Sequence, residues 1–141
     1  MIPRFRAWIK KQKAIVKTSD IVSIDFEDEM VEIQNVYFVD GLPDSRDLET
    51  YRFDEIKLMQ STGLKDKNGK EIFEGDIIAI EVDDTEAPIN AKIFQNSKIG
   101  MLMFHVFEDN EDVPMVELLE DNSVAFAVIG NIYENKELLD A

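Results

Sequence analysis

Apolar and polar residues alternate along much of the chain, and this period-two pattern predicts β-strands rather than helices. The first such segment, residues 4–9, alternates basic and apolar side chains and follows Pro3, which suits the start of a strand. A strand here would put Phe5, Ala7 and Ile9 on one face and the intervening residues on the other. The first residues therefore predict a strand with one apolar face, which we call the basic arm together with the lysines that follow it.

The alternation continues over residues 21–26 and 30–39, which predict two strands. The loop Glu27-Asp28-Glu29 between them fits a hairpin connection. Residues 40–50 are rich in aspartate and also contain glycine, proline and serine, so they predict a loop. A short helical turn is expected over residues 48–52.

Tight turns divide the second half of the chain into short strands. Asn68-Gly69 predicts a hairpin of type I′ between Leu64-Lys65 and Glu71–Phe73, because both residues tolerate the positive φ that this turn requires. A loop is expected over 83–88 and a last helical turn over 135–140. Further strands are predicted over the remaining apolar runs: 53–60, 77–82, 89–95, 99–107, 113–119 and 124–129.

The expected fold class is mainly β, with two units. Residues 1–62 predict an N-terminal β-rich unit that carries the basic arm. Residues 63–141 predict a small SH3-like β-barrel, in which closure would remove exposed sheet edges. The order of the strands does not follow from periodicity. A chain of 141 residues can bury a core without disulfides, and this one has no cysteine.

Charge is distributed unevenly along the chain. The net charge is −15, yet residues 1–19 contain six basic residues and no acidic one. The acidic residues that follow position 19 repel nucleic-acid phosphates, so direct nucleic-acid binding is not expected. No apolar run approaches the length of a signal peptide or a membrane span, so we expect a cytoplasmic protein without membrane contact. The six basic residues are Arg4, Arg6, Lys10, Lys11, Lys13 and Lys17.

Residues with catalytic or metal-binding potential are few. His105 is the only histidine, and we expect it to be a hydrogen-bonded or solvent-facing strand residue rather than a metal ligand. Acidic clusters at Asp83–Glu86 and Glu108–Asp112 favour solvated loops, with weak cation binding as the alternative. Serine with histidine or lysine forms no recognisable nucleophile arrangement. We therefore expect no catalytic, cofactor-binding or metal-binding residue, and no enzyme.

Arg4, Arg6 and Trp8 form the candidate interaction site of the chain. An exposed tryptophan between arginines could stack on a nucleobase or on an aromatic side chain of a partner. We favour the other interpretation, in which Trp8 packs the arm onto the body, because large aromatic rings dominate core energetics.

Three blocks carry more information than periodicity: Phe5–Trp8, Leu58–Ile77 and Val128–Asn135. In this order they resemble the YopX family of small proteins from bacteriophages and prophages of Gram-positive bacteria. The resemblance implies a phage-encoded protein of uncharacterised function with an SH3-type barrel in its later half, and it transfers no active-site residue. Three positions depart from the family pattern: Ile9, Ser61 and Lys136.

The leading hypothesis is a phage or prophage accessory protein that acts in the host cytoplasm through protein–protein contacts. The basic arm of one copy would dock on the acidic surface of another, giving a homo-oligomer that salt weakens; a host or phage protein is the other partner considered. One alternative is an acidic DNA mimic that inhibits a host DNA-binding protein, which requires carboxylates in two rows. The other is an enzyme or nucleic-acid binder that uses the barrel, which requires a pocket or a basic groove.

Overall fold

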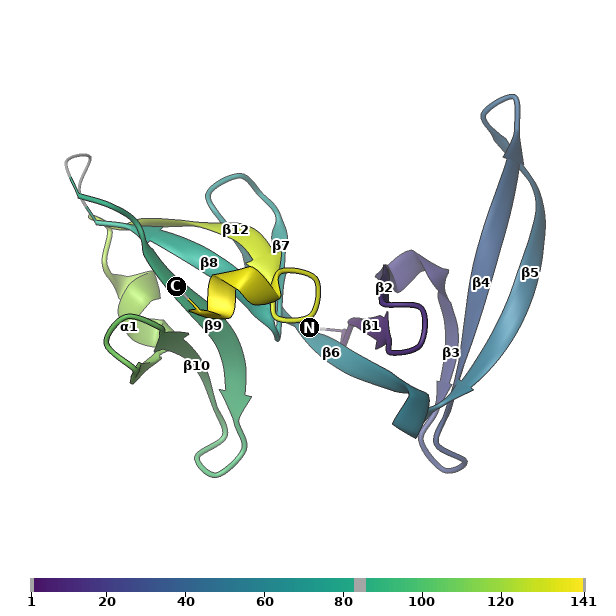
Figure 1. The fold of residues 1–141 in the computed structure, drawn as a ribbon, viewed down its shortest axis with the longest axis horizontal. Helices are drawn as coiled ribbons and strands as arrows, with labels where there is room; N and C mark the ends of the chain where they lie inside the picture. The colour runs from purple at the N-terminus through teal and green to yellow at the C-terminus, as the bar shows by residue number, and fades with distance from the viewer. Residues whose placement is uncertain (1, 83–85, 141) are drawn as a thin grey trace. The chain divides into compact units, whose positions relative to one another are not determined.

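The computed structural model describes residues 2–82 and 86–140 and confirms the mainly β fold. The chain forms two compact units, Ile2–Gln60 and the residues from Ser61 onward, and each is described by itself (Figure 1). No helix in the described residues has the length and apolar character that a bilayer crossing requires.

The N-terminal unit begins with an antiparallel hairpin of β1 (Phe5–Ile9) and β2 (Ala14–Val16). The first half of β6 (Ile56–Lys65) pairs with the other side of β1. Two short 3₁₀ turns, η1 (Thr18–Asp20) and η2 (Phe53–Glu55), connect this hairpin and β6 to the rest of the unit. The basic arm is therefore the outer part of a three-stranded arrangement.

Three further strands form a sheet in the order β3-β4-β5, namely β3 (Ile21–Asp25), β4 (Met30–Val39) and β5 (Leu42–Arg52). All neighbours are antiparallel. The shorter β3 pairs with only the first half of β4: its first residue, Ile21, lies opposite Ile33. In contrast, β5 pairs along the whole of β4. Beyond Ile33, β4 and β5 continue as a two-stranded hairpin (Figure 1).

The core of this unit lies at the first half of β4. Val31 and Ile33 point to the same face of the strand, since side chains alternate, and both are buried. They pack with Ala7, Ile9 and Ile56 from β1 and β6. The second half of β4 and nearly all of β5 lie outside this core and are exposed or half-buried.

The prediction of a loop over residues 40–50, with a helical turn over 48–52, is wrong, because these residues form most of β5. Proline and aspartate in this stretch suggested a loop. Since β5 lies at the edge of its sheet, one side of the strand can carry proline and polar residues facing water. Its strand conformation comes from pairing with β4, which the composition of the segment does not reveal.

The second unit is built on a five-stranded antiparallel sheet in the order β11-β10-β9-β8-β12. This sheet is a curled half-barrel, and its SH3-like character stays a prediction. Within the predicted loop over 83–88, residues 83–85 lie outside the described part of the chain. The elements that follow β6 are β7 (Glu71–Phe73), β8 (Asp76–Glu81), β9 (Ile89–Asn96), β10 (Met101–Val106), β11 (Glu111–Pro114), α1 (Met115–Glu120), β12 (Ala125–Asn131) and η3 (Lys136–Asp140).

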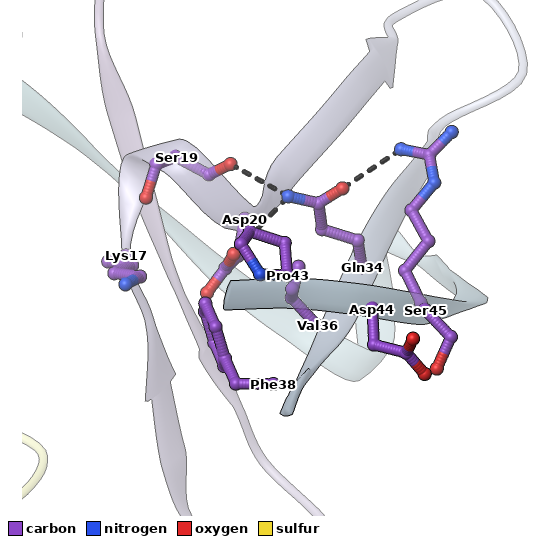
Figure 2. Close-up of a pocket in the computed structure, with 10 residues that line it drawn as sticks. Lys17, Ser19, Asp20, Gln34, Val36, Phe38, Pro43, Asp44 and Ser45 are labelled. Carbon is purple, nitrogen blue, oxygen red and sulfur yellow. Dashed lines mark hydrogen bonds between the residues drawn. The ribbon is translucent and has the colours of Figure 1, made fainter. Parts of the chain in front are cut away.

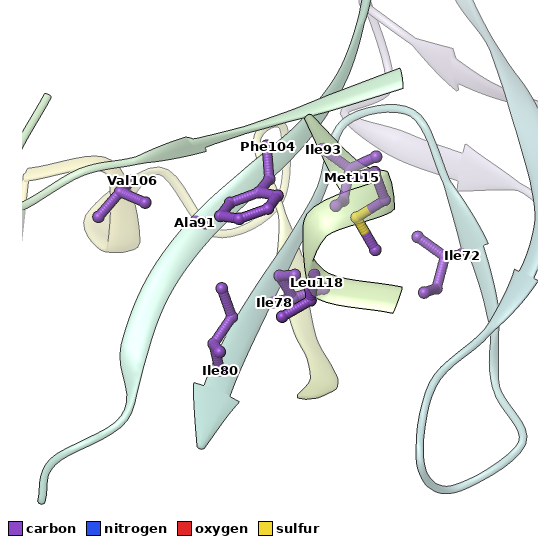
Figure 3. Close-up of a cluster of buried hydrophobic side chains, with 9 residues drawn as sticks. All are labelled: Ile72, Ile78, Ile80, Ala91, Ile93, Phe104, Val106, Met115 and Leu118. Carbon is purple, nitrogen blue, oxygen red and sulfur yellow. The ribbon is translucent and has the colours of Figure 1, made fainter. Parts of the chain in front are cut away.

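The strand predicted over residues 113–119 is also wrong, because most of it forms the helix α1. Met115 and Leu118 lie three residues apart, on one face of the helix, and are only 1% and 7% exposed. They pack against Ile78 and other apolar residues of the sheet, and together these form the core of the second unit (Figure 3). A helix of six residues is too short for its period to be distinguished from strand alternation.

The hairpin predicted around Asn68-Gly69 is present, since β6 and β7 pair antiparallel on its two sides. Its turn is not of type I′, because Gly69 has a φ of +81° whereas Asn68 is not among the residues with positive φ. The buried carboxylate of Asp66 organises the turn instead. It accepts hydrogen bonds from the backbone N–H groups of Asn68 and Lys70, both at 2.9 Å.

Candidate interaction surface

The outer end of the β4–β5 hairpin exposes a cluster of large apolar side chains. Tyr37, Phe38, Val39 and Leu42 are 51%, 61%, 55% and 70% exposed. They flank the turn Asp40-Gly41, whose residues have φ values of +52° and +79°, as a two-residue type I′ hairpin turn requires. We call these four residues the apolar tip. Such a tight turn keeps both strands paired up to the apolar tip.

A hollow of about 570 Å³ lies beside the second half of β4, between this strand and η1. The side-chain amide of Gln34 is part of its wall (Figure 2). Its Nε2 donates to the carbonyl oxygen of Ser19 at 3.3 Å and to Asp20 Oδ1 at 3.4 Å, and its Oε1 accepts from Arg46 Nη1 at 2.9 Å. These bonds tie the base of the projecting hairpin to η1.

Charged and apolar residues share the wall of this hollow. Lys17 and Arg46 contribute positive charge, and Asp20 and Asp44 contribute negative charge. Val36 and Phe38 of β4, with Pro43 of β5, contribute apolar surface. The mixture suits an extended peptide segment better than a small charged metabolite, because no single charge dominates.

Tyr37 is held along its own hairpin. Its phenol O–H donates to Asp47 Oδ2 at 2.9 Å. This hydrogen bond and the charge of Asp47 raise the pKa of Tyr37 above its ordinary value, with smaller contributions from burial and Glu49. The phenol therefore stays neutral, and the ring is fixed without being buried.

The predicted interaction site does not form one exposed cluster. Arg4 is exposed, while Arg6 is half-buried with its Nε 3.4 Å from the sulfur of Met59. Trp8 is only 9% exposed, so its ring is not available as an open stacking surface. Three of the arm's exposed basic residues lie together at the β1–β2 turn: Lys10, Lys11 and Lys13.

His105 makes the hydrogen bond expected of a strand histidine. Its Nδ1 lies 2.6 Å from Asp112 Oδ1, and its ring meets Phe107 edge to face at 5.9 Å. In the sheet, His105 is opposite Lys92 on one side and Asp112 on the other. A hollow of about 260 Å³ lies there, lined by these three residues and Phe94. No hydroxyl or thiol is among the residues that line this hollow.

No group of three or more histidine, aspartate or glutamate side chains is placed to hold a metal ion in residues 2–82 and 86–140. The acidic cluster Glu108–Asp112 lies at the β10–β11 connection, and Asp112 is used by His105. The cluster Asp83–Glu86 lies largely outside the described residues.

Comparison with known proteins decides the family. A profile described as YopX protein matches residues 4–140, nearly the whole chain. The chain belongs to the YopX family. The membership expected from three blocks of sequence is thereby confirmed. The YopX family is not a known enzyme family, and it assigns no functional residue to this chain.

Two crystal structures are similar to this YopX-family chain over its full length. One is protein EF1440 from Enterococcus faecalis, with 27% identity, 99% of each chain covered and a TM-score of 0.58. The other is the protein YopX from Bacillus subtilis, with 20% identity, 96% of this chain and 97% of that chain covered, and a TM-score of 0.62. The second likeness concerns the fold alone. Among proteins with curated descriptions, none matches this chain.

Proposed function

We propose that this YopX-family chain is a phage accessory protein that acts in the host cytoplasm through protein–protein contacts, including contacts between its own copies, and without catalysis. The observation that carries the proposal is the apolar tip, Tyr37, Phe38, Val39 and Leu42, each about half exposed or more. Large apolar side chains exposed together at one end of a hairpin favour a protein-binding surface.

The charge distribution supports contact between copies. The residues from Ser61 onward contain 18 acidic and six basic residues, whereas residues 1–19 contain six basic residues and no acidic one. Opposite charges on different parts of the chain favour an arrangement in which one copy's basic arm meets the acidic unit of another. The lysines of the β1–β2 turn are among the exposed residues of that arm.

Sedimentation of the full chain at two salt concentrations tests the proposal. We expect an oligomer at about 0.1 M salt, where charges more than about 10 Å apart are already screened. Raising the salt to about 1 M then weakens mainly the close ion pairs, and the oligomer should dissociate in part. A chain that sediments as a monomer at both salt concentrations would remove self-association from the proposal.

Mimicry of DNA is the second candidate function, favoured by the net charge of −15. A mimic presents carboxylates in place of phosphates and displaces DNA from the proteins that bind it. We expect a mimic to elute host DNA-binding proteins from a DNA-loaded resin at low salt. If the chain elutes none of them while an equally charged DNA competitor does, mimicry is excluded.

A further inference from the structure

The second half of β4 has a strand partner on one side only. On the side away from β5, β3 pairs with β4 from Met30 to Ile33 and no further. In the described part of the chain, no strand pairs with Gln34–Val39 on that side. We call these six residues the β4 edge. Backbone groups that point outward there are available to another strand.

The β4 edge lacks the features that keep exposed edges from pairing. It contains no charged residue and no proline, and Val36, Tyr37, Phe38 and Val39 all have high β propensity. Natural edge strands that face water usually carry charges, proline or bulges, which prevent pairing with other chains. An edge without them is an aggregation hazard unless a partner covers it.

The outer edge of β5, on the same hairpin, has all three of these protections. It contains a proline, Pro43, and a register shift opposite Tyr37 and Phe38 that leaves Asp44 as the extra residue. Because that extra residue belongs to β5, β4 itself runs regularly through its edge. The charged residues of β5 are Asp44, Arg46, Asp47, Glu49 and Arg52. Of the two edges of this hairpin, the β4 edge is therefore the one that can pair with another strand.

We infer that the β4 edge pairs with the β4 edge of a second copy, antiparallel and about a twofold axis at Tyr37. This inference rests on the proposed self-association and adds a second contact surface to the one between the basic arm and the acidic unit. With Tyr37 on the axis, residues equally far before and after it oppose one another. Val36 then meets Phe38 and Asn35 meets Val39, each pair occurring twice. The pairing joins the two hairpins into one four-stranded sheet.

The absence of charge along the β4 edge favours a second copy as its partner. The register places Asp40 of the second copy opposite Gln34, at the hollow whose wall contains two basic residues, Lys17 and Arg46, and two acidic residues, Asp20 and Asp44 (Figure 2). By symmetry the same contact forms twice. Two chains of net charge −15 repel over most of their surfaces, so the β4 edge, which contains no charged residue, is where two copies can approach without that repulsion.

Because the axis passes through Tyr37, Tyr37 of one copy lies opposite Tyr37 of the other, and substitutions at this residue test the pairing. Sedimentation equilibrium of the full chain compares wild type with Tyr37→Lys, which would place two ammonium groups opposite each other, and with Tyr37→Glu. We expect each variant to associate at least tenfold more weakly than wild type. An equimolar mixture of the two should regain association, because opposite charges then face across the axis.

Two matched controls accompany this test. Tyr37→Phe removes only the hydrogen bond to Asp47 and should associate like wild type. Leu48→Lys adds the same charge to the 48% exposed Leu48 on β5 and should also associate like wild type. Far-UV circular dichroism confirms that the hairpin still forms in every variant.

The outcomes separate the inference from the proposed function. A monomeric wild type would overturn self-association itself. A wild type that associates, with Tyr37→Lys associating equally well, would overturn the β4 edge as the surface and leave self-association standing. Variants that dissociate singly but fail to associate when mixed would overturn the register centred on Tyr37.

Discussion

Replacing Ile78 with alanine is expected to lower the free energy of unfolding by about 2–5 kcal/mol. Ile78 is fully buried in β8, which lies between β9 and β12 in the five-stranded sheet. Its side chain contacts the core cluster that the helix α1 covers, with Met115 and Leu118 (Figure 3). Truncation removes three carbons from a close-packed region and leaves a cavity. Urea unfolding followed by far-UV circular dichroism measures the loss.

Ile129→Ala is the matched control, because it makes the same truncation in the neighbouring strand β12. Ile129 is 42% exposed, so alanine leaves little cavity there and the expected loss is about 1 kcal/mol or less. Equal losses in the two variants would show that the cluster around Ile78 is not the core of the second unit.

Replacing Asp66 with alanine is expected to destabilise the chain by about 3 kcal/mol, because several backbone N–H groups lose their hydrogen-bond acceptor at once. The carboxylate is 7% exposed and accepts from Asn68 and Lys70 in the β6–β7 turn. Its other oxygen accepts from the N–H of Val128 in β12 at 2.8 Å. One side chain thus ties a hairpin turn to a strand 62 residues away in sequence. The midpoint of urea unfolding reports the change.

The same carboxylate makes stability depend on pH. Burial acts to raise the pKa of Asp66, but the hydrogen bonds from Val128, Lys70 and Asn68 and the charge of Lys70 outweigh it, so the pKa is lowered. The stabilisation is therefore present above the unfolded pKa of about 3.9 and is lost as the pH falls through the folded pKa. Asp66→Asn should show a shallower fall in stability below about pH 4 than wild type. Parallel pH profiles would contradict this role.

Strands with strong local signals were predictable from the sequence. The loop Glu27–Glu29 between two predicted strands became the connection of β3 and β4, where Asp25 Oδ1 accepts from the N–H groups of Glu27 and Asp28. The run Ile77–Ile80 became the buried strand β8 because both faces of it are covered. In these segments local preference and tertiary packing agree.

Segments whose conformation depends on distant partners were not predictable. β5 is a strand because β4 pairs with it, although Pro43 and the aspartates around it favour a loop in isolation. α1 is a helix because Met115 and Leu118 pack into a core made by other strands. Helix and strand patterns look alike in so short a segment.

The interaction surface was hidden from the sequence for a similar reason. The turn Asp40-Gly41 between Phe38-Val39 and Leu42 is a hairpin signal, but the polar residues that follow obscured it. The β4 edge lacks a strand partner because the pairing between β3 and β4 stops at Ile33. The composition of the segment does not reveal where that pairing stops. Trp8 drew attention as a rare aromatic beside arginines, and the structure buries it.

Amide hydrogen exchange of the full chain, followed residue by residue at increasing protein concentration, tests the self-associating β4 edge most directly. The N–H groups of Gln34–Val39 that point away from β5 should become more protected as the oligomer forms, while the outward N–H groups of Leu42–Arg52 keep their rates. Protection at the β4 edge that stays constant across concentrations at which the oligomer assembles would contradict the pairing of two copies there.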